Sequence, residues 1–413
     1  MKKPELLVPA SSLEVLKIAV VFGADAVYIG GESFGLRAKA KNFSMEDMRE
    51  GIDFAHAHHV KVYVTANILA HNGELDGVRA YFTELKGLKP DALIISDPGV
   101  FAIAREICPE LDVHISTQAN NTNYGTYRFW HKLGARRVVS ARELSLQEIA
   151  EIREHIPEDL EIETFIHGAM CISYSGRCLL SNYFTGRDAN RGACTHPCRW
   201  KYAVVEETRP GEYMPVYENE RGTYIFNSKD LCMIEHIPQL IQAGIDSFKI
   251  EGRMKTALYV ATVARTYRRA IDDYFISQEQ YERNMPWYLE QIVGCTYRQF
   301  TSGFFFGKPD EHTQIYDNNT YVKEYTYLGI VGERTDQGYR IEQRNKFSVG
   351  EQIEVMKPGG ENVSVIVKAI RDEEGNEMDS APHPKQVLYI DLGQPLAKFD
   401  ILRRQEKEEQ ADE

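Results

Sequence analysis

The 413-residue sequence predicts an α/β fold: a (β/α)8, TIM-like barrel followed by a small C-terminal all-β barrel domain. Short β-branched runs alternate with amphipathic helical patterns at roughly 25- to 35-residue intervals, which is typical of βα units around a parallel sheet. Eight such runs occur before residue 275, and eight strands with helical crossovers close a barrel. From residue 321 onward, short alternating strands follow one another without a helical pattern between them, which indicates a separate β domain.

The predicted barrel strands are separated by helical patterns whose starts carry Ser or Asp residues suited to capping. In chain order these strands cover residues 5–10, 25–30, 60–67, 91–96, 112–117, 136–141, 161–168 and 247–253. The turn after the first strand, PASS, is not the glycine-rich turn of an open dinucleotide-binding sheet, which favours a closed barrel. We therefore divide the chain into a barrel (1–275), a connecting segment (276–320), a β domain (321–405) and a charged tail (406–413).

The composition is that of an ordinary globular protein, with 43% hydrophobic and 26% charged residues. Glu14, Lys17 and Asp25 interrupt the apolar N-terminal pattern, so we expect no signal peptide and no membrane span, and predict a cytoplasmic protein. A net charge of -13 argues against nonspecific nucleic-acid binding by the whole surface. Seven cysteines, an odd number in a reducing compartment, argue against a disulfide framework.

The longest predicted βα loop follows the seventh strand over residues 168–228 and contains four cysteines with the spacing C-x6-C-x15-C-x3-C. These four are Cys171, Cys178, Cys194 and Cys198. Four thiolates ligate either zinc or an iron–sulfur cluster. The irregular spacing favours the cluster, because zinc ribbons usually pair two C-x2-C knuckles. Cys232, just beyond the loop, is an alternative fourth ligand.

Polar residues at the predicted strand ends surround the face of the barrel from which this loop emerges. The KIEGR run supplies paired opposite charges beside the loop, so Lys249, Glu251 and Arg253 are the predicted catalytic residues. Three further side chains are predicted to contact substrate: Asn67, Gln118 and His167.

The segment 163–201 is a basic island in an acidic protein, with five Lys or Arg residues against two carboxylates. Four of its arginines are predicted to contact substrate: Arg177, Arg187, Arg191 and Arg199. Guanidinium groups bind both phosphates and carboxylates, so the sequence does not divide these arginines between an RNA and a small anionic ligand. Aromatic residues of the same segment suit stacking on a splayed RNA base.

A family resemblance extends over almost the whole chain. The run ETFIHGAMCISYSGRCLLS at 163–181 resembles the signature of the collagenase-like peptidase family U32. The runs NSKDLC (227–232) and SFKIEGRMK (247–255) are also similar to that family, as are ACTHPCRWKY around Cys194 and Cys198 and the β-rich C-terminal region.

Several branches of that family are oxygen-independent hydroxylases of RNA or of a ubiquinone precursor and carry a [4Fe-4S] cluster, and CTxxCRWKY resembles the tRNA branch. The resemblance implies conversion of the wobble uridine in the tRNA anticodon loop to 5-hydroxyuridine, with prephenate as the small-molecule oxygen donor. It also implies that Cys171, Cys178, Cys194 and Cys198 ligate the cluster. A paralogous partner subunit stays open, as do two other functions, a collagenase-like peptidase and a zinc-stabilised RNA-binding protein.

Overall fold

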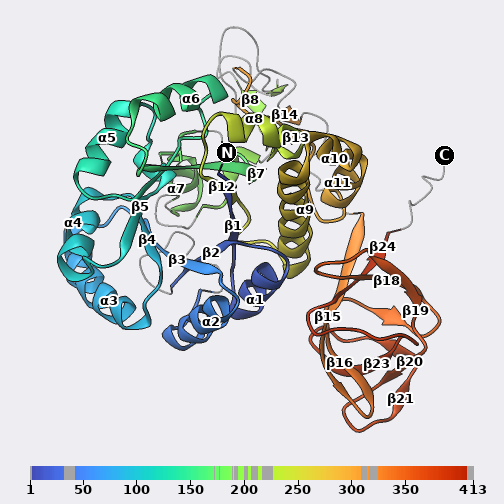
Figure 1. The fold of residues 1–413 in the computed structure, drawn as a ribbon. Coiled ribbons are helices and arrows are strands. Elements are labelled where there is room, and N and C mark those ends of the chain that lie inside the picture. Colours follow the sequence, from blue (N-terminus) through green and yellow to red (C-terminus); the bar gives the residue numbers. More distant parts are fainter. Residues whose placement is uncertain are drawn as a thin grey trace.

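Eight parallel strands close into a barrel surrounded by helices in the computed structural model of the chain (Figure 1). The structure describes residues 2–31, 42–171, 173–175, 177–187, 189, 194–199, 203–205, 213–215, 227–307, 314–315 and 324–406. The barrel strands are β1 (Glu5–Pro9), β2 (Ala26–Gly30), β3 (Lys61–Ala66), β4 (Ala92–Ile95), β5 (Asp112–Ile115), β6 (Arg137–Val139), β7 (Glu161–Ala169) and β12 (Ser247–Ile250). Strand β12 pairs with both β1 and β7, which closes the sheet. All eight coincide with predicted runs, and the predicted fold class is confirmed.

Helices connect these strands and cover the outside of the barrel (Figure 1). They are α1 (Leu13–Val21), α2 (Met45–Ala57), α3 (Leu75–Leu88), α4 (Pro98–Ile107), α5 (Tyr124–Lys132), α6 (Leu146–His155), α8 (Ile237–Gln242) and α9 (Ala257–Ile276). The side chains of Ser12, Ser44 and Ser145 each accept a hydrogen bond from a backbone N–H of the first turn. A cap of this kind stabilises a helix by about 1 kcal/mol, so these serines define where the helices begin.

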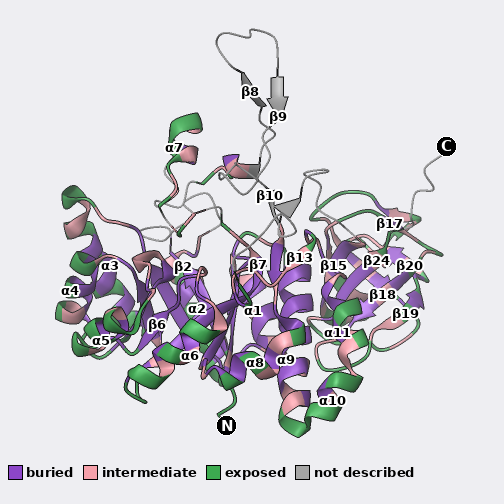
Figure 2. Ribbon diagram, turned by 90° about the horizontal axis from the view of Figure 1, so that it is seen from above, coloured by how far each residue is buried: buried purple, intermediate pink, exposed green. Residues whose placement is uncertain are grey.

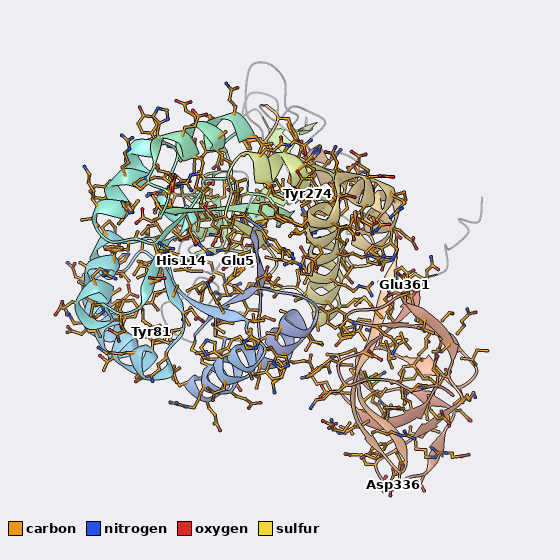
Figure 3. The ribbon with its side chains drawn as sticks, viewed as in Figure 1. Glu5, Tyr81, His114, Tyr274, Asp336 and Glu361 are labelled. Atoms are coloured by element: carbon orange, nitrogen blue, oxygen red, sulfur yellow. The ribbon has the colours of Figure 1, made fainter. Side chains whose placement is uncertain are left out.

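Alternation along the strands separates an outer apolar core from the barrel interior. On β1, Leu6 belongs to the large core between strands and helices, whereas Leu7 belongs to a small interior cluster with Tyr63. The interior also holds charged and titratable side chains: Glu5 and His114 lie near the centre of the barrel (Figure 3). The interior is therefore a polar layer as well as an apolar one.

The long loop predicted after the seventh strand leaves the barrel after β7, and we call it the excursion. Its described elements are α7 (Leu180–Thr185), η4 (Pro197–Arg199), β8 (Ala203–Val205), β9 (Tyr213–Pro215), β10 (Asn227–Ser228) and β11 (Asp230–Cys232). Helix α7 stands clear of the barrel on the side opposite the N-terminus (Figure 2). Strand β11 returns the chain to the barrel and pairs antiparallel with the end of β7, where Leu231 lies opposite Gly168.

The segment predicted as a connection, 276–320, packs onto the barrel over its described residues. It contains α10 (Gln278–Arg283), α11 (Met285–Ile292), β13 (Phe300–Thr301) and β14 (Gln314–Ile315). Tyr281 and Tyr288 are buried in the outer core of the barrel, and β13 extends the barrel sheet by pairing with β11. This part of the chain therefore belongs structurally to the barrel.

The C-terminal domain is an antiparallel sheet around its own apolar core. Its strands are β15 (Tyr325–Thr335), β16 (Gly338–Gln343), β17 (Phe347–Ser348), β18 (Gln352–Met356), β19 (Val363–Ile366), β20 (Ala369–Arg371), β21 (Glu377–Met378), β22 (Ser380–Ala381), β23 (Val387–Asp391) and β24 (Ile401–Gln405). Arg265 of α9 donates to the Lys357 carbonyl at 2.9 Å, and Arg344 pairs with Glu14 of α1 at 2.6 Å. These contacts fix the domain beside the barrel. Across the described residues, none of the helices combines the length and apolarity needed to cross a membrane.

Candidate active site

A cavity of about 420 Å³ lies between the carboxyl ends of the barrel strands and the excursion. Four strand ends contribute to it through Asn67 after β3, Gln118 in η2 (Thr117–Ala119) after β5, Phe165 on β7 and Lys249 on β12. Residues of the excursion form the opposite wall. This is the end at which (β/α)8 barrels carry their reactive groups.

All four clustered cysteines line this cavity. Cys171 directly follows β7, Cys178 precedes α7, and Cys194 and Cys198 lie on either side of the entry into η4. The structure describes all seven cysteines of the chain, and they carry thiols rather than disulfides. The fold thus brings the four thiols of the loop to one cavity.

Hydroxyl groups join α7 to the segment that carries Cys194. The Thr195 N–H donates to Ser181 Oγ at 3.1 Å, and Thr185 Oγ1 lies 3.2 Å from Thr195 Oγ1. His196 adopts the left-handed conformation, with φ 55°, and its N–H donates to Cys194 Sγ at 3.4 Å. Hydrogen bonds to the sulfurs are one means by which proteins tune iron–sulfur clusters.

The donor set suits a thiolate-ligated metal, since four cysteines are the usual ligands of [4Fe-4S] clusters and of structural zinc. In this conformation, however, the described side chains include no group of three or more His, Cys, Asp or Glu arranged to hold a metal ion. Metal binding would therefore have to draw the four thiols together across the cavity wall.

Cys232 does not line the cavity. It lies on β11, and its sulfur is 3.7 Å from the hydroxyl oxygen of Tyr267 on α9. Burial raises the pKa of the Cys232 thiol to about 11, which disfavours the thiolate that a metal needs. Cys198, unlike Cys232, shares the cavity with the other three thiols of the loop.

The three predicted catalytic residues, Lys249, Glu251 and Arg253, all line the cavity. Lys249 Nζ lies 2.6 Å from Glu163 Oε1. Glu251 forms an ion pair with Arg142 at 3.6 Å. The Arg253 guanidinium donates to Thr65 Oγ1 at 3.0 Å and to Asn42 Oδ1 at 3.2 Å. Each charged group is thus held by a neighbouring strand or loop.

Two glycines allow close packing against Glu251 and Arg253. A Cβ atom at Gly30, the last residue of β2, would lie 2.5 Å from Arg253 Nη1. A Cβ atom at Gly168 would lie 2.4 Å from the Glu251 carbonyl oxygen, and Gly168 has a φ of 107° that side chains rarely adopt. The close approach of both strand ends to the residues just after β12 therefore depends on glycine.

The other three predicted substrate contacts on strand ends divide into two groups. Asn67 and Gln118 line the cavity, and Asn67 donates to Ser116 Oγ at 3.3 Å. Gln118 Oε1 has no hydrogen-bond partner among the described residues, so it suits an N–H donor of a ligand. His167 lies elsewhere: it is buried against Tyr267 of α9, with ring centroids 5.5 Å apart.

The position of His167 follows from the pairing of β7 with β12. The pairing of β7 with β12 shifts register between Lys249 and Ile250, so the strict alternation that would turn His167 toward the cavity after Phe165 is broken. Burial lowers the pKa of His167 to about 3, which makes the ring neutral at physiological pH. We therefore leave His167 out of the proposed substrate contacts.

The predicted arginines of the basic island lie outside the cavity wall wherever they are described. Arg177 is exposed and donates to Asn120 Oδ1 at 2.7 Å, and Arg187 is exposed just after α7. Arg191 and the side chain of Arg199 lie outside the described residues. The sequence reasoning missed Arg142, which lines the cavity and lies 4.0 Å over the Phe165 ring. Its position directly after the sixth predicted strand was the available signal.

The fold and the cavity define a (β/α)8-barrel protein with a thiol-lined site at the carboxyl ends of its strands. The sequence model of peptidase family U32 matches residues 11–315, and that of the family's C-terminal domain matches residues 323–403. The chain belongs to peptidase family U32.

Named relatives align with much or nearly all of this chain. It is 42% identical to "tRNA hydroxylation protein P1" of Bacillus subtilis, over 98% of this chain and 95% of that protein. It is 39% identical to "tRNA hydroxylation protein P" of Escherichia coli, over 96% of this chain and 95% of that protein. A third relative, "23S rRNA 5-hydroxycytidine C2501 synthase" of Escherichia coli, is 39% identical over 65% of this chain and 39% of that protein.

Proposed function

We propose that this protein is a tRNA-modifying enzyme that hydroxylates the wobble uridine to 5-hydroxyuridine without molecular oxygen. In this proposal a [4Fe-4S] cluster is ligated by Cys171, Cys178, Cys194 and Cys198, and prephenate is the oxygen donor. The observation that carries the proposal is that the four thiols share one cavity with three charged side chains. These are Lys249 on β12 and Glu251 and Arg253 just after it.

The choice of RNA rests on the relatives and on the exposed surface near the cavity. Two relatives that align with nearly the whole chain are named for tRNA hydroxylation, and a third for making a 5-hydroxylated pyrimidine in ribosomal RNA. Around α7, Tyr183 is 81% exposed and Phe184 44% exposed, beside the exposed Arg177 and Arg187. Unstacked bases bind to exposed aromatic rings while arginines hold the phosphates, so this surface suits an anticodon loop.

The cluster assignment rests on the donor set at the cavity. Four thiols and the N–H···S contact at Cys194 match thiolate ligation, and Cys232 lies outside the cavity. When bound there, a cluster would supply redox chemistry beside the barrel mouth. The protein's own part is to hold the thiols on a loop whose ends are anchored by β7 and β11.

The donor assignment is supported by the charge of the cavity wall. Arg142, Lys249 and Arg253 line it with one lining carboxylate, Glu251, and Glu163 beneath the wall pairs with Lys249, so positive charge is still in surplus in a protein of net charge -13. Uracil is neutral, so the surplus suits an anionic co-substrate, and prephenate is a dianion. Arginine also binds carboxylates through two parallel hydrogen bonds.

The test is to delete the gene in a strain without related paralogues and to measure modified nucleosides in total tRNA by mass spectrometry. We expect 5-hydroxyuridine and its derivatives to disappear, and to return when the wild-type gene is restored. Unchanged 5-hydroxyuridine would refute the proposed substrate. Collagen or gelatin cleavage by the pure protein, abolished by a point mutation in the cavity, would instead support the peptidase activity that the family's name describes.

The cluster is tested separately on protein purified without oxygen. We expect bound iron and a broad absorption near about 400 nm, both lost in Cys171→Ala. Cys232→Ala is the matched control, because this cysteine lies outside the cavity, and it should retain the iron. Stoichiometric zinc without iron would favour the zinc-stabilised RNA-binding protein.

A further inference from the structure

A buried chain of charges passes through the barrel interior beneath the cavity. Glu163 on β7 is fully buried, and its two carboxylate oxygens contact different cations. Oε1 lies 2.6 Å from Lys249 Nζ, and Oε2 lies 3.1 Å from Arg137 Nη1 on β6. A buried carboxylate is expensive unless it is paired, so this arrangement constrains all three side chains.

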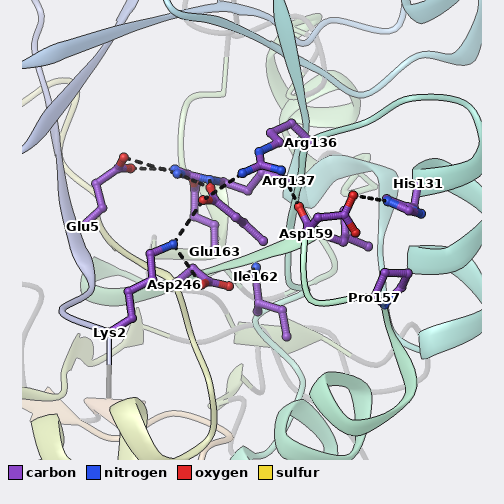
Figure 4. A network of polar contacts seen from close by, with 12 residues as sticks. Lys2, Glu5, His131, Arg136, Arg137, Pro157, Asp159, Ile162, Glu163 and Asp246 are labelled. Carbon is purple, nitrogen blue, oxygen red and sulfur yellow. Dashed lines mark hydrogen bonds and ion pairs between the residues drawn. The ribbon is translucent and has the colours of Figure 1, made fainter.

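Arg137 is held from the opposite end of the barrel. It is 3% exposed, and its guanidinium contacts Glu5 at 2.6 Å (Figure 4). It also contacts Glu161 at 2.6 Å. The Tyr63 hydroxyl on β3 donates a hydrogen bond to Glu5 Oε2 at 2.6 Å. Strands β1, β3, β6 and β7 thus fix the guanidinium, which cannot turn away from Glu163 without breaking several charge-assisted hydrogen bonds.

Lys249 is the member of this chain that reaches the cavity wall. Its Nζ lies 4.5 Å from the centre of the Tyr28 ring on β2 and 5.4 Å from that of Phe165 on β7. Ring faces attract a cation, so both contacts help to hold Lys249 Nζ in this position. Glu163 supplies its counter-charge at 2.6 Å.

The remaining charged or titratable groups around Lys249 lie on its own strand end and on the neighbouring strands. Glu251 and Arg253 follow Lys249 along the chain. The Arg142 guanidinium lies over the ring of Phe165, which Lys249 also contacts. On β5, burial and then the positive charges of Arg137 and Lys249 lower the pKa of His114 well below its usual value. His114 is therefore neutral and adds no positive charge near the ammonium.

We propose that Glu163, held in place by Arg137, is a positioning residue that supplies the counter-charge of Lys249 and directs Lys249 at the cavity, where Lys249 binds an anionic oxygen of the small-molecule donor. The inference rests on the proposed function for the identity of that donor. It assigns Lys249 an electrostatic binding role and excludes a neutral-amine role, such as imine formation or proton abstraction.

The first experiment measures the charge of Lys249 without any substrate. Formaldehyde with cyanoborohydride methylates only neutral amines, and peptide mass spectrometry reports the methylated fraction at each lysine. In wild-type protein we expect Lys249 to resist methylation at about pH 8, while the exposed Lys132 reacts. In Glu163→Gln the ammonium loses its counter-charge beside Arg137, and labelling of Lys249 should rise at least about tenfold.

Glu161→Gln is the matched control, because Glu161 also contacts Arg137 but does not touch Lys249. It should leave labelling of Lys249 unchanged, which separates the counter-charge from a general disturbance of the barrel interior. If Lys249 is labelled in wild-type protein as readily as Lys132, or resists labelling equally in Glu163→Gln, Glu163 does not set its charge and the proposal is refuted.

The second experiment measures prephenate binding by calorimetry between about pH 6 and pH 9. Wild-type affinity should stay level across this range, because the Glu163 counter-charge stays beside Lys249. In Glu163→Gln the affinity should fall at least about tenfold as the pH rises and the amine loses its proton. A merely structural defect would weaken binding equally at every pH and would refute the charge-setting role.

The two experiments also separate this inference from the proposed function. If prephenate fails to bind wild-type protein at any pH, the donor assignment fails and so does the binding role of Lys249. The labelling result would still decide whether Glu163 holds the charge. Loss of 5-hydroxyuridine in the deletion strain, in contrast, reports only on the function and not on Glu163.

Discussion

Replacing Gly30 with alanine tests how much the position of the Arg253 guanidinium matters. The new Cβ would lie 2.5 Å from Arg253 Nη1 and 2.8 Å from its Cζ. Ordinary contacts need about 3.5 Å, so the guanidinium must shift by about 1 Å. Such a shift breaks or lengthens its hydrogen bonds to Thr65 Oγ1 and Asn42 Oδ1, now 3.0 Å and 3.2 Å long.

The expected cost falls on activity rather than on folding. Losing one charge-assisted hydrogen bond to a ligand costs about 1.5–3 kcal/mol, which corresponds to a fall of about 10- to 150-fold in kcat/KM for the proposed donor, prephenate. Gly30 ends a strand and does not have a positive φ, so alanine adds little backbone strain. Thermal unfolding should therefore change by no more than a few degrees.

The assay is formation of 5-hydroxyuridine in a tRNA substrate at varied prephenate concentration, with unfolding followed in parallel. Gly87→Ala is the control, because a Cβ atom there meets no other atom within 4 Å, and it should leave kcat/KM unchanged. Wild-type kcat/KM in Gly30→Ala, in protein that folds normally, would refute the view that the site needs Arg253 in this position.

Three further outcomes concern residues on β7 and on β11, which pairs with it. Gly168→Ala should destabilise the protein by about 1–3 kcal/mol, seen as a lower melting temperature, because φ is 107° and the new Cβ would meet the Glu251 carbonyl oxygen; an unchanged melting temperature would contradict this. His167 has a pKa of about 3 when folded and about 6.5 when unfolded, so between these values the unfolded chain binds the extra proton and stability falls as the pH is lowered. His167→Gln should flatten that part of the stability–pH curve, by roughly 1 kcal/mol per pH unit in denaturant titrations, and an unaltered slope would count against a buried neutral ring. Cys232, with a pKa of about 11, should react with iodoacetamide at about pH 8 far more slowly than the exposed Cys171 of metal-free protein, and equal rates would argue against its burial.

The periodic parts of the fold could be predicted because their signals are local. Each barrel strand is a short β-branched run bounded by turn residues, and all eight occur where the pattern placed them. The gathering of Cys171 and Cys198 at one cavity also followed from the sequence, since a long loop at the carboxyl end of a barrel strand must lie over the mouth.

The features that could not be predicted depend on contacts between distant segments. The register shift that turns His167 away from the cavity arises from the pairing of β7 with β12, more than 80 residues later in the chain. The partners of Glu163 come from β6 and β12, so a single strand pattern shows a buried carboxylate without showing what neutralises it. Likewise, Cys232 is withdrawn from the cavity by antiparallel pairing of β11 with β7.

The pairing of β7 with β12 connects the charged residues of the cavity to the cysteine loop. Strand β7 carries Glu163 beneath the cavity and Phe165 in its wall, then turns at Gly168 and delivers Cys171 to the loop. Strand β12 carries Lys249 opposite Phe165 and the carbonyl of Glu251 against Gly168. A displacement of β7 relative to β12 therefore moves the proposed donor contacts and the first thiol together. The charges proposed to bind the donor and the thiol loop are consequently held in one fixed relation by backbone pairing, which the proposed reaction between a bound donor and a base at the same mouth would require.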